Sequence, residues 1–128
     1  MRHPGVAMAG ARAITKAVRD DAYTAARHLR GGRDVEKSLR KGKEAHVFND
    51  GVDLKALEQR VWTEGRYAGR VGAGRRAEFD RFVWRSDTPI GTRIQDGKPD
   101  VPLHWVEIEG KIVNGDWAYH LVPRPRPA

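Results

Sequence analysis

An Asn-Gly dipeptide, Asn114-Gly115, constrains the fold of this chain more than any other feature. Asn-Gly is the strongest short signal for a two-residue β-hairpin turn, because both residues readily adopt positive φ. The segments on either side alternate apolar and polar residues, as strands do. Taking the dipeptide as the loop pairs Val113 with Asp116, and the pairing extends outward to Ile108 opposite Leu121.

This register divides the hairpin into two faces, because successive side chains of a strand point to opposite sides. The apolar face is expected to pack against helices and holds Ile108, Ile112, Trp117, Tyr119 and Leu121. The other face holds ionisable side chains, namely Glu107, Glu109, Lys111 and His120. A slip of one residue would expose two aromatic rings to water, so the register is well constrained.

Helical spacing of apolar residues occupies the first half of the chain, and strand-like alternation occupies the second. This order predicts an α+β fold, in which N-terminal helices pack on one face of a four- to five-stranded antiparallel meander sheet. The expected helices span residues 8–29, 34–41 and 53–65, and the expected strands span 43–48, 78–85, 89–95, 101–113 and 116–122.

The length of 128 residues fits a single domain over 1–128. Segment 65–77 contains four glycines and four arginines without periodicity, which predicts a mobile basic loop. Residues 1–10 and 123–128 are expected to be flexible tails, the second because its alternating prolines cannot join a central strand. No apolar run approaches the roughly 20 residues of a membrane span, so none is expected.

The charge of the chain predicts an anionic partner. Lys and Arg number 24 against 17 Asp and Glu, which gives a net charge of +7, and basic residues gather in two zones, 1–44 and 66–95. Such zones suit nucleic acid or an acidic protein, although a solvated surface without a partner has the same composition. The absence of cysteine excludes disulfides, thiolate metal sites and cysteine nucleophiles.

The ionisable face of the hairpin has the side chains that general acid–base catalysis needs. The register places Glu109 directly opposite His120, with Cβ atoms expected about 5 Å apart. Lys111 follows on the same face and can hold an oxyanion or a phosphate. The alternative is an ordinary exposed cross-strand pair, which stabilises a sheet by a few tenths of a kcal/mol.

The other histidines have structural interpretations. His28 ends the first expected helix, where a cation stabilises the helix dipole. His46 and His104 fall on expected strands beside apolar residues, which is typical of core or edge positions. No two histidines have the i, i+4 helical spacing of a zinc site, so no metal is expected.

Several segments together resemble the C-terminal toxin domains of bacterial polymorphic and contact-dependent inhibition systems. The likeness is closest to the ribonuclease fold that barnase, the EndoU nucleases, the ribonuclease colicins and the RelE toxins share. The residues that carry it are His28-Leu29-Arg30 at a helix end, segment 42–48, the helix that begins Asp53-Leu54, and a meander that ends in Tyr119-His120-Leu121-Val122-Pro123.

The resemblance implies a metal-independent, cofactor-free ribonuclease. In that chemistry the 2′-hydroxyl of the RNA attacks the adjacent phosphate and leaves a 2′,3′-cyclic phosphate. Carried onto this chain, Glu109 or His28 takes the 2′-hydroxyl proton and His120 protonates the leaving oxygen. Lys111 and Arg93 stabilise the charge on the phosphorus. The substrate-binding residues would be Lys43, Arg66, Arg70, Arg75, Arg76, Thr92 and Arg93.

The resemblance also implies partners and a place of action. The substrate would be RNA, with tRNA among the candidates, and an acidic immunity protein would neutralise the domain. It would act in the bacterial cytoplasm, after secretion as part of a larger effector.

Two other functions fit parts of the sequence. A nucleic-acid-binding module without catalysis would use the arginines together with Tyr67, Trp84 and Trp105 to bind and stack bases. An ADP-ribosyl transferase or another NAD-consuming toxin would use the Glu-x-Glu spacing of Glu107-Ile108-Glu109.

Overall fold

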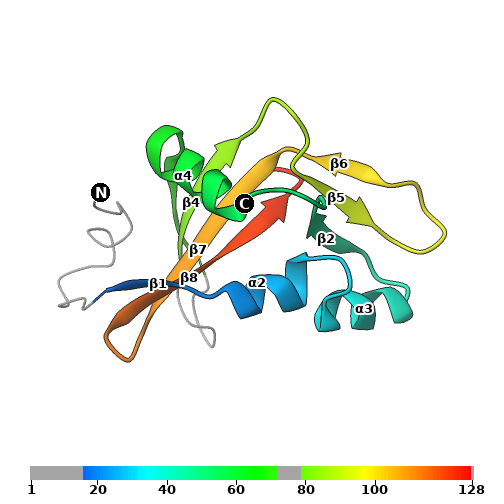
Figure 1. Cartoon of the computed structure of the whole chain (residues 1–128), viewed down its shortest axis with the longest axis horizontal. Coiled ribbons are helices and arrows are strands. Elements are labelled where there is room, and N and C mark those ends of the chain that lie inside the picture. The colour runs from blue at the N-terminus through cyan, green and yellow to red at the C-terminus, as the bar shows by residue number, and fades with distance from the viewer. Residues whose placement is uncertain (1–15, 72–78, 128) are drawn as a thin grey trace.

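A computed structural model describes residues 16–71 and 79–127, and these form an α+β fold (Figure 1). In this part of the chain, the helices lie before residue 65, with two short strands among them, and six strands follow. In chain order the elements are β1 (Ala17–Arg19), α2 (Asp21–His28), α3 (Arg33–Arg40), β2 (Ala45–Phe48), α4 (Leu54–Glu64), β3 (Arg66–Val71), β4 (Phe79–Arg85), β5 (Gly91–Ile94), β6 (Val101–Leu103), β7 (Trp105–Val113) and β8 (Asp116–Arg124).

The strands form two sheets. The larger has the order β1-β8-β7-β4-β3 and is mixed, because β1 runs parallel to β8 while the other neighbours are antiparallel. The smaller has the order β2-β5-β6 and is antiparallel. The expected α+β class is therefore confirmed, whereas the single meander is replaced by two sheets.

The predicted hairpin register is confirmed. Val113 pairs with Asp116, Glu109 with His120 and Ile108 with Leu121. Asn114 and Gly115 have φ of 52° and 85°, the positive values that a tight hairpin turn requires.

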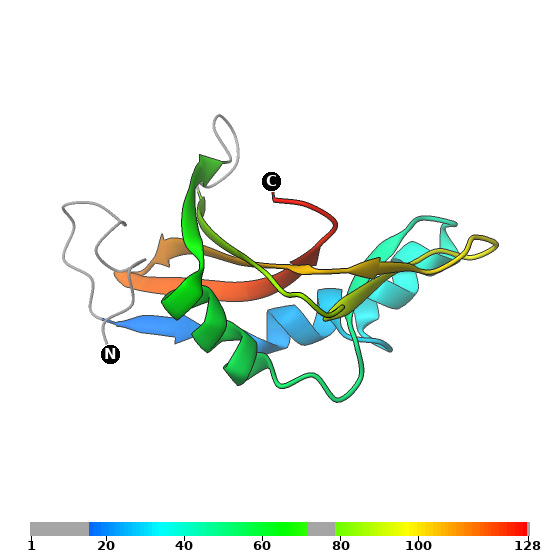
Figure 2. The ribbon, with the colours of Figure 1, turned by 90° about the horizontal axis from the view of Figure 1, so that it is seen from above.

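The apolar face of the hairpin forms the core against α4. Trp117, Ile108 and Leu121 are almost fully buried there, and they pack with Leu57 and Val61 of the helix. Figure 2 shows α4 on one side of the larger sheet, whereas the end of β3 and the chain after Arg124 rise on the other side. By strand alternation, Glu109 and His120 lie on the opposite face of the larger sheet from the core side chains Ile108 and Leu121.

The first expected helix begins later than predicted. Residues 17–19 form β1 instead, because the edge of β8 needs hydrogen-bond partners: the amide of Trp117 donates to the carbonyl of Lys16 and the amide of Asp20 to that of Tyr119. The Asp20 side chain then caps α2 by accepting from the amide of Tyr23. Residues 8–15 lie outside the described part.

Three of the other differences from the sequence prediction are the largest. Residues 66–71, expected in the mobile loop, form β3, which has a bulge after Tyr67; 72–78 lie outside the described residues. The expected strand 101–113 divides into β6 and β7 at His104, whose backbone carbonyl accepts from Ser86. Pro123 and Arg124, expected in a tail, end β8, where Arg124 pairs with Trp105.

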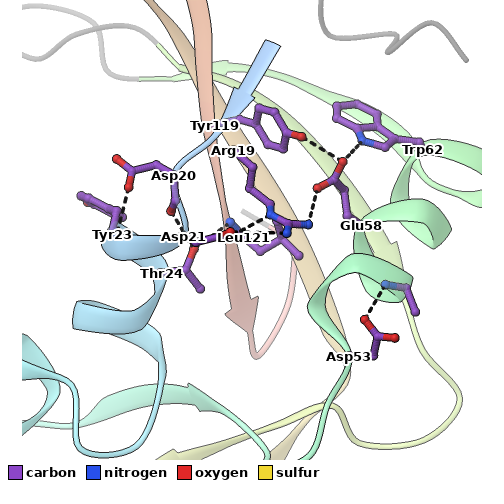
Figure 3. A network of polar contacts seen from close by, with 11 residues as sticks. Arg19, Asp20, Asp21, Tyr23, Thr24, Asp53, Glu58, Trp62, Tyr119 and Leu121 are labelled. Carbon is purple, nitrogen blue, oxygen red and sulfur yellow. Dashed lines mark hydrogen bonds and ion pairs between the residues drawn. The ribbon is translucent and has the colours of Figure 1, made fainter.

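A polar network fastens β1 to α4 (Figure 3). The carboxylate of Glu58 accepts from Arg19 at 3.0 Å, from Tyr119 at 2.9 Å and from the indole of Trp62 at 3.1 Å. Arg19 also binds Asp21, at the start of α2. Burial and the charge of Glu58 together raise the pKa of Tyr119, so its hydroxyl stays a donor. The network fixes the edge strand from which α2 extends toward His120.

Candidate active site

The paired strands β7 and β8 bring a carboxylate and an imidazole together. Oε1 of Glu109 lies 3.3 Å from Nε2 of His120, as the predicted register requires. Their side chains are only 16% and 9% exposed, so the pair is largely buried rather than lying on an open surface as expected. Partial burial reduces competition from water and strengthens the interaction between the two groups.

The last residue of β8 adds a cation to this pair. Nη2 of Arg124 lies 3.4 Å from Oε2 of Glu109 and 3.1 Å from Oε2 of Glu107. Glu107, Glu109 and Arg124 share one face of the hairpin with His120. Four ionisable side chains therefore form one continuous cluster.

The two glutamates of this cluster have opposite pKa shifts. Burial would raise the pKa of Glu109, but the hydrogen bond with His120 and the charge of Arg124 outweigh it and lower that pKa to about 2. Burial, supported by the charge of Glu109 and opposed by Arg124, raises the pKa of Glu107 to about 7. The surroundings thus favour the anionic form of Glu109 and the neutral form of Glu107.

A pocket of about 310 Å³ opens beside His120. The rings of Tyr23 and Phe79 flank the imidazole, with centroids 4.2 and 6.4 Å from it. The ammonium of Lys111 lies over the Phe79 ring, 5.1 Å from its centroid. The lining residues are Asp20, Tyr23, Phe79, Lys111, Val113, Ala118, Tyr119 and His120.

His28 opens into a different pocket. It lines a space of about 150 Å³ together with His46, Glu44 and Ser38. Its Nδ1 donates to the backbone carbonyl of His46 at 3.0 Å, which leaves Nε2 unprotonated in the neutral ring. Burial and the charges of His120 and Arg124 lower the pKa of His28 to about 4 although the hydrogen bond opposes the shift.

The neutral His28 predicts a specific sensitivity to acid. The pKa of His28 is lower in the folded protein than in the unfolded chain, so the unfolded chain takes up the proton at a higher pH. The neutral imidazole therefore contributes its full stability above pH 6.5, and this contribution is lost as the pH falls toward 4. His28→Asn keeps a donor for the carbonyl of His46 but cannot be protonated. Between pH 7.5 and pH 5, we expect the wild type to lose about 2 kcal/mol more free energy of unfolding than the variant, measured by urea denaturation. Equal losses in the two proteins would contradict a buried neutral imidazole.

The predicted phosphate-binding residues are spread over the molecule. Arg66 and Arg70 lie on β3, where Arg70 binds the buried Asp80 at 3.2 Å. Thr92 and Arg93 lie on β5 in the smaller sheet, where they bind Asn49 and the carbonyl of Pro99. Lys43 is exposed just before β2. Arg75 and Arg76 lie outside the described residues.

Sequence reasoning missed three residues around the Glu109–His120 pair. Tyr23 and Phe79 line its pocket, and Arg124 holds Glu109. The register itself could have indicated Arg124, since extending it by three pairs beyond Ile108 and Leu121 places this residue on the face of Glu109. No sequence signal indicated Tyr23, because residues 8–29 were expected to form one continuous helix without the turn that joins β1 to α2.

Within residues 16–71 and 79–127, no group of three or more His, Cys, Asp or Glu side chains is arranged to hold a metal ion. In the same part of the chain, no helix is long and apolar enough to cross a membrane.

Comparison with known proteins identifies a family without a known activity. The family model described as a domain of unknown function, DUF6972, matches residues 14–128. No curated protein and no solved structure matches the chain.

Proposed function

The chain belongs to the DUF6972 family, a domain of unknown function, and we propose that it cleaves RNA by metal-independent acid–base catalysis at His120. One observation carries the proposal: the imidazole of a largely buried carboxylate–imidazole pair lines a pocket that also contains an ammonium group. The net charge of +7 supports a polyanionic substrate, and it equally suits the acidic immunity protein that the sequence resemblance implies.

The low pKa of Glu109 gives the two members of the pair different roles. Glu109 is a weak base because its pKa is held at about 2 and both its oxygens already have partners. Its role is to fix the tautomer of His120 and to stabilise the imidazolium that forms when the ring accepts a proton. With Nε2 directed at Glu109, Nδ1 is the ring nitrogen that exchanges a proton with the substrate.

The proposed reaction is a transesterification at phosphorus, in which one phosphorus–oxygen bond forms as another breaks. His120 takes the proton of the 2′-hydroxyl while the 2′ oxygen bonds to phosphorus, and the bond from phosphorus to the 5′ oxygen breaks. The products are a 2′,3′-cyclic phosphate and a 5′-hydroxyl. Among the described lining residues, the ammonium of Lys111 stabilises the phosphate, and the hydroxyl of Tyr23, which accepts from Arg27, protonates the leaving 5′ oxygen.

The volume and the lining of the pocket agree with one nucleotide as the reacting unit. Its volume of about 310 Å³ is at the small end of ligand sites. The rings of Tyr23 and Phe79 offer apolar surface for a base, while Lys111 and His120 offer polar groups for a phosphate.

The proposal predicts cleavage of RNA in the presence of EDTA. Purified full-length protein is incubated with total RNA and with a labelled single-stranded oligoribonucleotide, and the ends of the fragments are identified by mass spectrometry. We expect fragments that end in 2′,3′-cyclic phosphate, and an uncut deoxyribonucleotide control because DNA lacks the 2′-hydroxyl. Intact RNA with folded protein would refute the proposal, and salt-dependent binding without cleavage would select the non-catalytic nucleic-acid-binding alternative.

A further inference from the structure

The end of β8 contributes a charged residue that the proposed reaction does not use directly. Arg124 lies 3.1 Å from Glu107 and 3.4 Å from Glu109, and it contacts the oxygen of Glu109 that does not face His120. The carboxylate of Glu109 is therefore held at both ends, by the guanidinium through Oε2 and by the imidazole through Oε1.

We propose that Arg124 is a positioning residue for His120, which acts by holding the Glu109 carboxylate against the imidazole. Its importance for catalysis rests on the proposed function, whereas its effect on the imidazole does not. Arg124 reaches no lining position of the pocket beside His120, so it acts through Glu109.

The electrostatics explain why a cation is needed at this place. Glu107 and Glu109 are separated by one residue on β7, so they project from the same face. Glu107 is fully buried, and two neighbouring carboxylates would repel each other there. Arg124 offsets this repulsion, and a guanidinium is suited to contact both groups because its donors form a planar fork.

The surroundings of the two glutamates differ. Burial raises the pKa of Glu107, whereas the hydrogen bond with His120 and the charge of Arg124 outweigh burial and lower the pKa of Glu109. The anionic form of Glu109 is therefore the one that Arg124 and His120 stabilise. Arg81 pairs with Glu109 across β4 and β7, but its guanidinium donates to the backbone carbonyl of Ala68.

The backbone around Arg124 favours a fixed position. Pro123 and Pro125 precede and follow it, and each proline restricts its own φ to about −65°. Pro123 is buried and pairs with Val106, while Arg124 pairs with Trp105. The side chain therefore starts from an ordered strand end, which lowers the entropy lost when it binds the two glutamates.

Histidine NMR tests this inference without reference to turnover. The imidazole ¹⁵N shifts of His120 are measured at pH 8 in the full chain for the wild type, Arg124→Gln, Arg124→Lys and Arg126→Gln. The last variant removes the same charge from an exposed residue two positions away and serves as the matched control. In the wild type and in Arg126→Gln, we expect one tautomer with the proton on Nε2. Arg124→Gln should show averaged tautomers, and Arg124→Lys an intermediate pattern.

Activity measurements separate positioning from binding. On a cleavable oligoribonucleotide, we expect Arg124→Gln to lower kcat by about 10- to 100-fold with little change in KM, because a misplaced catalytic group costs rate rather than affinity. Wild-type ¹⁵N shifts of His120 in both Arg124 variants would overturn the inference. If Arg124→Gln does not fold, the test depends on Arg124→Lys, and wild-type ¹⁵N shifts of His120 in that variant would overturn the inference. If no RNA is cut, the shifts still decide the role of Arg124, and only the proposed function fails.

Discussion

Replacing Gly110 with alanine is expected to lower the free energy of unfolding by about 3 kcal/mol or more, the upper end for an overpacked core. Gly110 lies in the middle of β7 and pairs with Tyr119. A Cβ atom at this position would overlap the indole ring of Trp117. The ring is fully buried and packed against Trp62 and Phe82, so it cannot move aside without disturbing the core.

Two further variants separate this steric effect from backbone strain. Gly51 has φ of 80° and open space around it, so Gly51→Ala should cost only about 1 kcal/mol, from strain alone. Trp117→Phe should relieve the overlap, so that Gly110→Ala costs less when it is combined with Trp117→Phe than in the wild type. Urea denaturation is measured for the wild type, the three single variants and the double variant. A cost at Gly110 no larger than at Gly51, or a cost that is independent of Trp117, would contradict the predicted overlap.

The sequence predicts the hairpin fully because its determinants are local. The turn type follows from two adjacent residues, Asn114 and Gly115, and the buried face follows from a period of two. The pairing of Glu109 with His120 depends on nothing else, so the central part of the candidate site was predictable.

The two sheets were not predictable in the same way, because their pairing is not local. β5 pairs with β2, so that Ile94 meets Ala45 across almost fifty residues of chain. Gly91 allows this approach, since a Cβ there would overlap the carbonyl of Val47. A meander assumes that consecutive strands are neighbours, and nothing in the alternation of residues 89–95 indicates that this strand leaves the larger sheet.

The burial of the Glu109–His120 pair was missed for the same reason. Alternation predicts which residues share a face, but it does not predict what covers that face. The cover comes from Tyr23 at the start of α2 and from Phe79 on β4. Tyr23 reaches the imidazole because α2 begins directly after β1, and the parallel pairing of β1 with β8 could not be inferred from apolar spacing.

Substituting glutamine for His120 is expected to lower the rate of RNA cleavage by about 10²- to 10⁴-fold, the usual contribution of a general acid–base group. Glutamine retains a donor that can reach Glu109, and it retains most of the volume of the ring, but it cannot accept and release a proton at neutral pH. The change therefore removes the proposed chemistry while it leaves the contact at 3.3 Å nearly intact. Initial rates on a fluorogenic oligoribonucleotide in EDTA provide the measurement, with thermal unfolding as the check on folding.

The chain contains a matched control for this substitution. His46 also contacts a glutamate through Nε2, at 2.7 Å from Glu44, but this pair lines the smaller pocket instead of the one beside His120. His46→Gln removes the same ring from the same kind of pair, so it should leave the rate within about 3-fold of the wild type if the chemistry belongs to the larger pocket. Equal losses in the two variants would show a general effect on RNA binding or folding. Loss in His46→Gln alone would move the reacting group to the pocket that contains His28, whose unprotonated Nε2 is then the base.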